Sequence, residues 1–124
     1  MRFESHLGRP VLRTDLRHCH EDEFLVRLGW AERYVDARLR PYCVLWDITG
    51  STLTREISRA TKALAVRIRE QRLSTGSATI GVCGLKRVMA RAVEPHMYWA
   101  TDVEDALRWL TRSERWRDAA TPGH

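Results

Sequence analysis

The chain has 124 residues, which fits one domain of ordinary size and argues against two independent cores. Hydrophobic residues make up 44% and charged residues 30%, as in a globular domain, and no stretch approaches the ~20 apolar residues of a membrane helix. The formal net charge of +5 favours acidic partners, although a GC-rich genome that prefers arginine produces the same excess. Residues 1–10 lack the apolar core of a secretory signal, so we expect a cytoplasmic protein.

The cysteines favour the same compartment. Cys19, Cys43 and Cys83 are odd in number and widely spaced, and the last two lie inside apolar runs. Buried free cysteine behaves as a small hydrophobic residue, so we expect no disulfide framework.

The first half of the chain predicts a strand, a helix and a second strand. Residues 1–10 are predicted to be a loose lead-in, and residues 11–18 a strand with one wet face, of undecided direction. Acidic residues at 21–23 suit a helix start, Pro41 stops the helix, and its apolar stripe is Phe24, Leu28, Ala31, Val35 and Leu39. The continuous apolar run at 42–48 is typical of a strand buried on both faces.

The second half repeats this alternation. A turn at 49–52 leads into a helix at about 54–72, with an apolar side formed by Leu53, Ile57, Ala60, Leu64 and Ile68. A strand at 78–83, a short helix from Leu85 to Val93 and a strand at 97–100 follow. Thr101 or Asp102 caps the last helix, Trp109 and Trp116 shield its edge, and residues 117–124 are expected to be a frayed tail.

Strand and helix thus alternate four times across one domain spanning 1–124. This order predicts an α/β fold with a single small four-stranded, mostly parallel sheet flanked by helices. Ligands of such sheets usually lie beyond the carboxyl ends of the strands, here residues 47–52, 84–87 and 100–102.

Three segments in order, YCVLWDITGST, ATIGVCGLKRVMARAV and YWATDVEDALRWL, resemble the STAS (SpoIIAA-like) family, and its divergent bacterial STAS-like branch most closely. The resemblance covers residues from about 42 to 110. It implies a small sheet with helices packed mainly on one side, and a non-enzymatic, regulatory role in protein–protein or small-ligand binding.

The resemblance also implies a switch. In antagonist members of the family, a serine or threonine at the start of the helix after this strand is phosphorylated. That position corresponds here to Ser51, Thr52 or Thr54, with Ser51 and Thr52 as the candidates. The family's Asp-Ser-Ser-Gly-Leu signature is absent, and Thr-Leu-Thr-Arg-Glu-Ile stands in its place.

These observations predict a binding surface on the turn after the second predicted strand and on neighbouring strand ends. Arg55 and Arg59 are expected to contact an acidic partner, and we expect no cofactor and no catalytic residue. Five tryptophans in so short a chain make a homodimer an alternative partner. The surface comprises Asp47, Thr49, Gly50, Ser51, Thr52, Thr54, Arg55, Arg59, Gly84, Lys86, Thr101 and Asp102.

Asp47 supports a competing hypothesis of phosphoryl chemistry. An aspartate at a strand end followed by a small polar turn faintly resembles haloacid-dehalogenase phosphatases and the phosphoacceptor of response-regulator receivers. Lys86 and Thr101 are candidates for its accessory groups, but no acidic pair accompanies the first predicted strand. The structural alternative is that Asp47 caps the turn.

Two weaker hypotheses remain. Nucleic acid is an alternative partner, because Arg55, Arg59, Lys62 and Arg69 recur near helical spacing, as do Arg87 and Arg91, although such stripes are more often a solvated face. His18-Cys19-His20 contains metal-ligand residue types but lacks the spacing of a zinc site, so we expect no metal.

Overall fold

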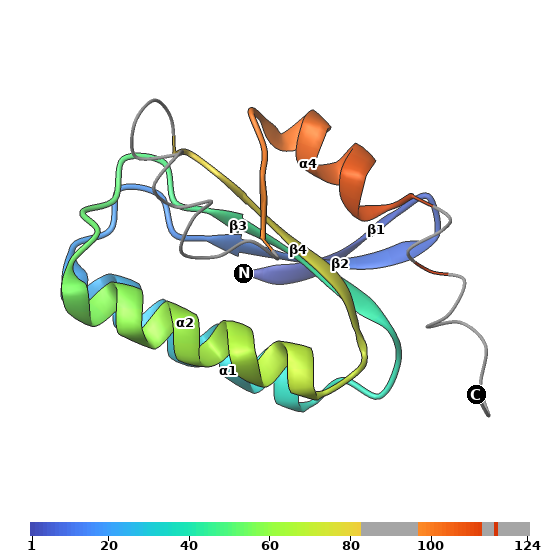
Figure 1. Ribbon diagram of the computed structural model, residues 1–124, viewed down its shortest axis with the longest axis horizontal. Coiled ribbons are helices and arrows are strands. Elements are labelled where there is room, and N and C mark those ends of the chain that lie inside the picture. Colours follow the sequence, from blue (N-terminus) through green and yellow to red (C-terminus); the bar gives the residue numbers. More distant parts are fainter. Residues whose placement is uncertain (83–96, 113–115, 117–124) are drawn as a thin grey trace.

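The computed structural model describes residues 1–82, 97–112 and 116 of the chain (Figure 1). The fold is α/β, as expected, with helices on both faces of a five-stranded sheet in the order β1-β2-β3-β4-β5. The predicted count of four strands was therefore wrong by one. The predicted helix from Leu85 to Val93, Gly84, Lys86, and the predicted tail at 117–124 lie outside the described residues.

The additional strand is β1 (Arg2–His6), in the segment predicted to be a loose lead-in. It pairs antiparallel with β2 (Arg9–Asp15) through the two-residue loop Leu7–Gly8. Both loop residues have positive φ, 52° and 76°, as in the type I′ turn whose twist suits a hairpin. Phe3 anchors β1 because its ring packs edge-on against Tyr34 and Tyr42, at centroid distances of 6.0 Å. A single aromatic residue in a five-residue polar strand gives only a weak alternation of apolar and polar residues, so the sequence did not predict β1.

The remaining strands run parallel to one another. They are β2, β3 (Tyr42–Asp47), β4 (Ser74–Ile80) and the short β5 (Tyr98–Trp99). The first predicted strand thus runs parallel to its neighbour. In the register, Asp15 lies opposite Asp47 and Asp47 opposite Ile80, so the carboxyl ends of β2, β3 and β4 meet at one edge of the sheet. β3 is central and its first five residues are buried, which confirms the prediction from its apolar run.

Among the described elements, two helices cover one face of the sheet and one helix covers the other (Figure 1). α1 (Glu21–Asp36) and α2 (Arg55–Glu70) pack side by side, and α4 (Val103–Leu110) lies on the opposite face. The apolar stripes of both long helices face the sheet, except at their ends. Leu39 is 91% exposed because α1 ends at Asp36, and Leu53 is 47% exposed because it precedes the N-cap of α2.

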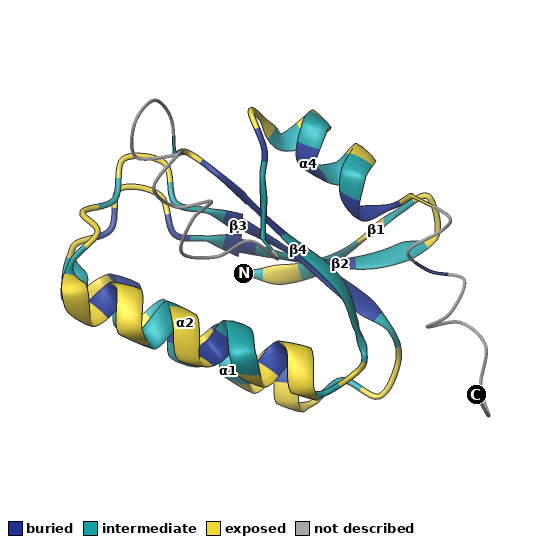
Figure 2. Ribbon diagram, viewed as in Figure 1, coloured by how far each residue is buried: buried dark blue, intermediate teal, exposed yellow. Residues whose placement is uncertain are grey.

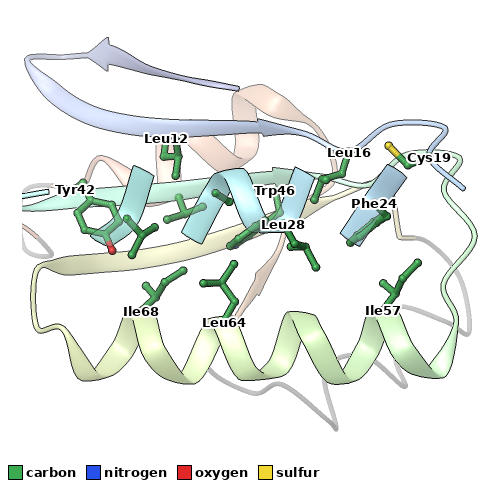
Figure 3. Packing of buried hydrophobic residues seen from close by; sticks show 13 residues of the cluster. Leu12, Leu16, Cys19, Phe24, Leu28, Tyr42, Trp46, Ile57, Leu64 and Ile68 are labelled. Atoms are coloured by element: carbon green, nitrogen blue, oxygen red, sulfur yellow. The ribbon is translucent and has the colours of Figure 1, made fainter. Parts of the chain in front are cut away.

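The sheet separates two hydrophobic cores, visible as buried stripes in Figure 2. The larger core lies between the sheet and α1 with α2. In Figure 3, Tyr42 and Trp46 of β3 point toward Leu64 and Ile68 of α2. The smaller core lies beneath α4 and includes Trp116, whose indole Nε1 donates to the carbonyl of Leu110 at 2.8 Å. Within the described residues, no helix is long and apolar enough to cross a membrane.

Candidate functional site

The loops that follow β2 and β3 are joined to each other beyond the ends of the strands. The N–H of Leu16 donates to the carbonyl of Asp47 at 2.9 Å, and the N–H of His18 donates to the carbonyl of Thr49 at 2.8 Å. The parallel ladder therefore continues into the turn that was predicted from the sequence to be part of a binding surface. These two hydrogen bonds hold the loop after β2 beside the loop after β3.

Ser51 fastens the same two loops with its side chain. Its Oγ accepts a hydrogen bond from the N–H of Cys19 at 2.9 Å and donates one to the carbonyl of Leu16. The hydroxyl is thus used as donor and acceptor, and the residue is half-buried. The Ser51 hydroxyl is therefore engaged with the loop after β2, whereas neighbouring Thr52 is exposed.

Two glycines make room for this arrangement. Gly50 has φ of 72°, and a Cβ built there would lie 2.2 Å from Nδ1 of His18. Gly81, after β4, has φ of 100°, and its Cβ would lie 2.5 Å from the backbone nitrogen of Thr49. Both positions therefore need glycine for conformation and for space. The turn is consequently packed between its neighbours on both sides.

The Asp47 carboxylate serves the turn. Its Oδ1 accepts hydrogen bonds from Oγ1 of Thr49 at 2.7 Å and from the N–H of Thr49 at 3.2 Å, which is the cap expected of a structural aspartate. Its Oδ2 lies 3.7 Å from Nε of Arg17, and its side chain is 16% exposed. Both oxygens of Asp47 therefore already face partners from the surrounding loops.

Arg17 also pairs with Asp15 at the end of β2. Its Nε and NH2 donate to the two carboxylate oxygens of Asp15 at 2.9 and 3.0 Å. These side-chain hydrogen bonds from Arg17 lower the pKa of Asp15 to about 2. The adjacent carboxylates of Asp15 and Asp47 thus share one guanidinium. Sequence reasoning missed Asp15 and Arg17, because only the parallel register of β2 and β3 brings them to Asp47.

Thr54 starts α2 and ties it to α1. Its Oγ1 accepts from the N–H of Ile57 at 3.2 Å, as an N-cap does, and donates to Oε1 of Glu21 at 2.7 Å. Threonine is a favoured N-cap residue, so the cap was readable from the sequence, whereas the partner Glu21 was not. The start of α2 is therefore held by one hydrogen bond within its own first turn and by another to α1.

The outward face of α2 is basic. Arg55, Arg59, Lys62 and Arg69 are exposed and recur at spacings of three, four and seven residues, opposite the buried apolar stripe. Arg59 has a partner on its own helix, Glu56, at 3.4 Å. The other three form no ion pair within the described part of the chain. Arg67, on the flank, instead pairs with Glu32 and Asp36 of α1 at 2.6 and 2.7 Å.

Thr101 and Asp102 lie at the same edge of the sheet, but after β5, which is separated from β3 by β4. Asp102 caps α4 by accepting from the N–H of Asp105 at 2.8 Å. Asp105 accepts from the N–H of Thr101 at 2.9 Å and from the hydroxyl of Tyr98 at 2.9 Å. The hydrogen bond from the Thr101 N–H contributes most to lowering the pKa of Asp105. Thr101, Asp102 and Asp105 therefore form a helix cap of their own at the start of α4.

The metal hypothesis gains no support from the geometry. Among residues 1–82, 97–112 and 116, no three histidine, cysteine or acidic side chains gather as a metal site would require. Cys19 is buried, its Sγ donates to the carbonyl of Arg17 at 3.6 Å, and burial raises the pKa of its thiol. His18 and His20 are exposed on either side of it.

Comparison with known proteins supplies no relative. No protein-family model, no curated protein and no solved structure matches the chain. The geometry of the site therefore carries the functional argument by itself.

Proposed function

We propose that this chain is a non-enzymatic, regulatory binding module of the STAS-like kind. Its binding surface is the turn after β3 together with the outward face of α2, and its partner is a protein with an acidic surface. The main support for this proposal is the row of exposed cationic side chains on α2. Of these, Arg55, Lys62 and Arg69 lack acidic partners among the described residues.

The rigidity of the turn supports recognition. The Ser51 hydrogen bonds, the Gly50 and Gly81 contacts and the Thr54 cap hold the residues that precede Arg55. A preorganised surface loses little conformational entropy on binding, so more of the interaction energy appears as affinity. Exposed Leu53 adds an apolar contact beside Arg55 and Arg59, and arginine is enriched in protein interfaces.

The side-chain contacts of Asp47 support a structural role for it over nucleophilic attack on phosphorus. Thr49 and Arg17 already occupy its carboxylate, and Arg17 compensates charge that a divalent cation would otherwise compensate. A protein partner is favoured over nucleic acid because no aromatic side chain interleaves with the basic row on α2.

Thr52 is the modification site that fits this module best. Its side chain is exposed, whereas the Ser51 hydroxyl is engaged with Leu16 and Cys19. A phosphate on Thr52 would add about −1.5 to −2 charges beside Arg55 and at the start of α2. It would therefore weaken docking of an acidic partner.

The test compares two charge reversals of equal size. Wild type, Arg55→Glu/Arg59→Glu and the control Arg40→Glu/Arg112→Glu are used to capture proteins from nuclease-treated native lysate, and the captured proteins are identified by mass spectrometry. Arg40 and Arg112 are exposed residues outside the turn and α2. We expect one acidic partner that both wild type and control retain and that the α2 variant loses. Equal capture by all three proteins would refute the proposed surface.

A second experiment addresses the competing hypotheses. Wild type and Asp47→Asn are incubated with magnesium and acetyl phosphate and their intact masses compared, and DNA and RNA are titrated at low salt. We expect no phosphoryl adduct and no change in nucleic-acid mobility. A phosphoryl adduct on wild type that Asp47→Asn lacks would overturn the non-enzymatic module in favour of phosphoryl chemistry. Mobility shifts abolished by Arg55→Glu/Arg59→Glu would replace the protein partner by a nucleic acid.

A further inference from the structure

β1 is the edge strand of the sheet, and no described strand pairs with its outer side. In an antiparallel ladder, pairs that exchange two backbone hydrogen bonds alternate with pairs that exchange none. Pro10 lies opposite Ser5 and has no N–H, so that pair is one that exchanges none, and by alternation so is Phe3 with Leu12. The N–H and C=O groups of Phe3 and Ser5 therefore point away from β2, along the open edge.

A row of large apolar side chains continues this edge onto α1. Val26, Trp30 and Tyr34 are spaced by four residues and are 54%, 47% and 40% exposed. They lie apart from both faces of α1 that are already used: Phe24, Leu28, Ala31 and Val35 face the sheet, and Leu25, Gly29 and Glu32 face α2. The rings of Tyr34 and Phe3 pack edge-on with their centroids 6.0 Å apart, so the row on α1 and the edge of β1 form one continuous surface.

We propose that a second copy of this chain covers this surface, with the two β1 strands paired antiparallel about Phe3. In that register, each Phe3 lies opposite Phe3 of the second copy, where the outward backbone groups of both residues can exchange two hydrogen bonds. The same two-fold axis brings the α1 rows of both copies together, because they lie on the same side of the sheet as Phe3.

The charges of β1 select this register. Pairing about Phe3 places Arg2 opposite Glu4 of the second copy, and does so twice, since the interface is symmetric. Opposite charges at directly facing positions, with Cβ atoms about 4.5–5.5 Å apart, favour pairing. The neighbouring register, about Glu4, would set Glu4 against Glu4 and is unfavourable. Of these two registers, only pairing about Phe3 sets opposite charges against each other, in addition to the Arg2–Glu4 ion pair at 2.7 Å within one chain.

The apolar row supplies the binding energy. Exposed tryptophan and tyrosine are typical anchors of protein interfaces, and edge strands that are not covered invite pairing with another chain. This inference is independent of the basic face of α2, because α1 and β1 contribute none of the residues proposed to bind the acidic partner. Failure of either proposal leaves the other standing.

The first test measures the molar mass of the chain by sedimentation equilibrium over micromolar to millimolar concentrations. We expect wild type to dimerise and Trp30→Glu to dimerise at least about tenfold more weakly. The control is Leu53→Glu, because Leu53 has the same exposed fraction of 47% but lies after β3, and it should dimerise like wild type. Monomeric wild type at every concentration, or equal weakening by Leu53→Glu, would overturn the proposal.

The second test examines the register by charge complementation. Arg2→Glu carries two acidic residues on β1 at positions 2 and 4, and Glu4→Arg carries two basic residues there. Each variant alone should dimerise more weakly than wild type, and an equimolar mixture should form a heterodimer with affinity near that of wild type. This recovery cannot arise from contacts within one chain. Single variants that dimerise as tightly as wild type, or a mixture that dimerises no more tightly than either variant while both remain folded by circular dichroism, would refute the pairing about Phe3.

Discussion

Single residues decide how firmly the turn after β3 is held. Ser51 is the clearest example, because its one hydroxyl bonds two backbone groups of the loop after β2, which lie 32 and 35 positions away in sequence. Arg17 plays a comparable role through charge, since it faces both Asp15 and Asp47. Neither contact is visible in the sequence, because each depends on the parallel pairing of β2 with β3.

Replacing Ser51 by alanine should destabilise the fold. The substitution leaves the N–H of Cys19 and the carbonyl of Leu16 without their partner, which typically costs about 1–3 kcal/mol when such groups stay away from water. Urea denaturation measures the free energy of unfolding. Thr52→Ala is the control, since Thr52 is exposed, and should change it by less than about 0.5 kcal/mol. Equal effects would show that the Ser51 hydroxyl is dispensable.

Removing the guanidinium of Arg17 should raise the pKa of Asp15. Hydrogen bonds from Arg17 hold this pKa at about 2, against a usual value of 3.8, and Arg17→Met should return it toward the usual value in an NMR pH titration. Because the folded-state pKa is the lower one, the pair stabilises the fold above about pH 4 and loses that contribution as pH falls toward 2. The difference in unfolding free energy between wild type and Arg17→Met should shrink over the same range. An unchanged Asp15 pKa in the variant would contradict this cause.

At the scale of elements, the sequence located most helices and strands and misplaced their ends. Periodicity identified α1, α2 and α4, and the apolar run identified β3. β4 begins at Ser74, four residues before the predicted strand, because polar residues there pair with β3. β1 was missed because its backbone pairing with β2, and not an apolar pattern, defines it. Backbone pairing of this kind leaves little trace in local composition.

The connection after β4 should be intolerant of any side chain at position 81. Gly81→Ala combines a positive φ of 100° with a Cβ at 2.5–2.6 Å from Thr49, and we expect a loss of about 2 kcal/mol or more in unfolding free energy. Gly8→Ala is the matched control, because Gly8 has φ of 76° but nothing within 4 Å of its Cβ. The difference between the variants in chemical denaturation isolates the contact with Thr49. A larger loss in Gly8→Ala would refute it.

Gly29→Ala should stabilise the fold, whereas Gly81→Ala should destabilise it. Gly29 lies within α1, and a Cβ there would meet nothing within 4 Å. Alanine restricts the unfolded chain and favours the helix, so the free energy of unfolding should rise by about 0.5–1 kcal/mol. Thermal and urea denaturation measure the gain. A loss of stability would mean that α1 and α2 lie too close together to accommodate the methyl group of alanine at position 29.

At the scale of the molecule, stability should be highest in the middle of the sheet. β3 pairs on both sides, and its first five residues are buried between the two cores. Its amide hydrogens should therefore exchange only on global unfolding, whereas those of β5, with two residues, should exchange through local opening. Hydrogen exchange followed by NMR across a series of denaturant concentrations separates the two classes. Faster exchange in β3 than in β5 would contradict the two-core arrangement.

The sequence predicted the fold class more accurately than the arrangement of side chains on the surface. Alternating strand and helix patterns are sufficient to predict an α/β fold with a mostly parallel sheet. They do not reveal which exposed side chains lie together. The basic row on α2 was visible as a helical spacing, whereas the contact between Phe3 and Tyr34 joins segments 31 positions apart and needed the hairpin to be known.

Strand order in this sheet is the same as chain order, so every strand pairs with the strand before it along the chain. The pairings of β2 with β3 and of β3 with β4 each close one connection that holds a helix, as Val11 with Cys43 and Leu45 with Ala78, and no described pairing joins the first strand to the last. Synthesis on the ribosome proceeds in the same direction, so the hairpin of β1 and β2 can form first and each later strand can add to an existing edge. We therefore expect co-translational folding to advance strand by strand from the N-terminal hairpin.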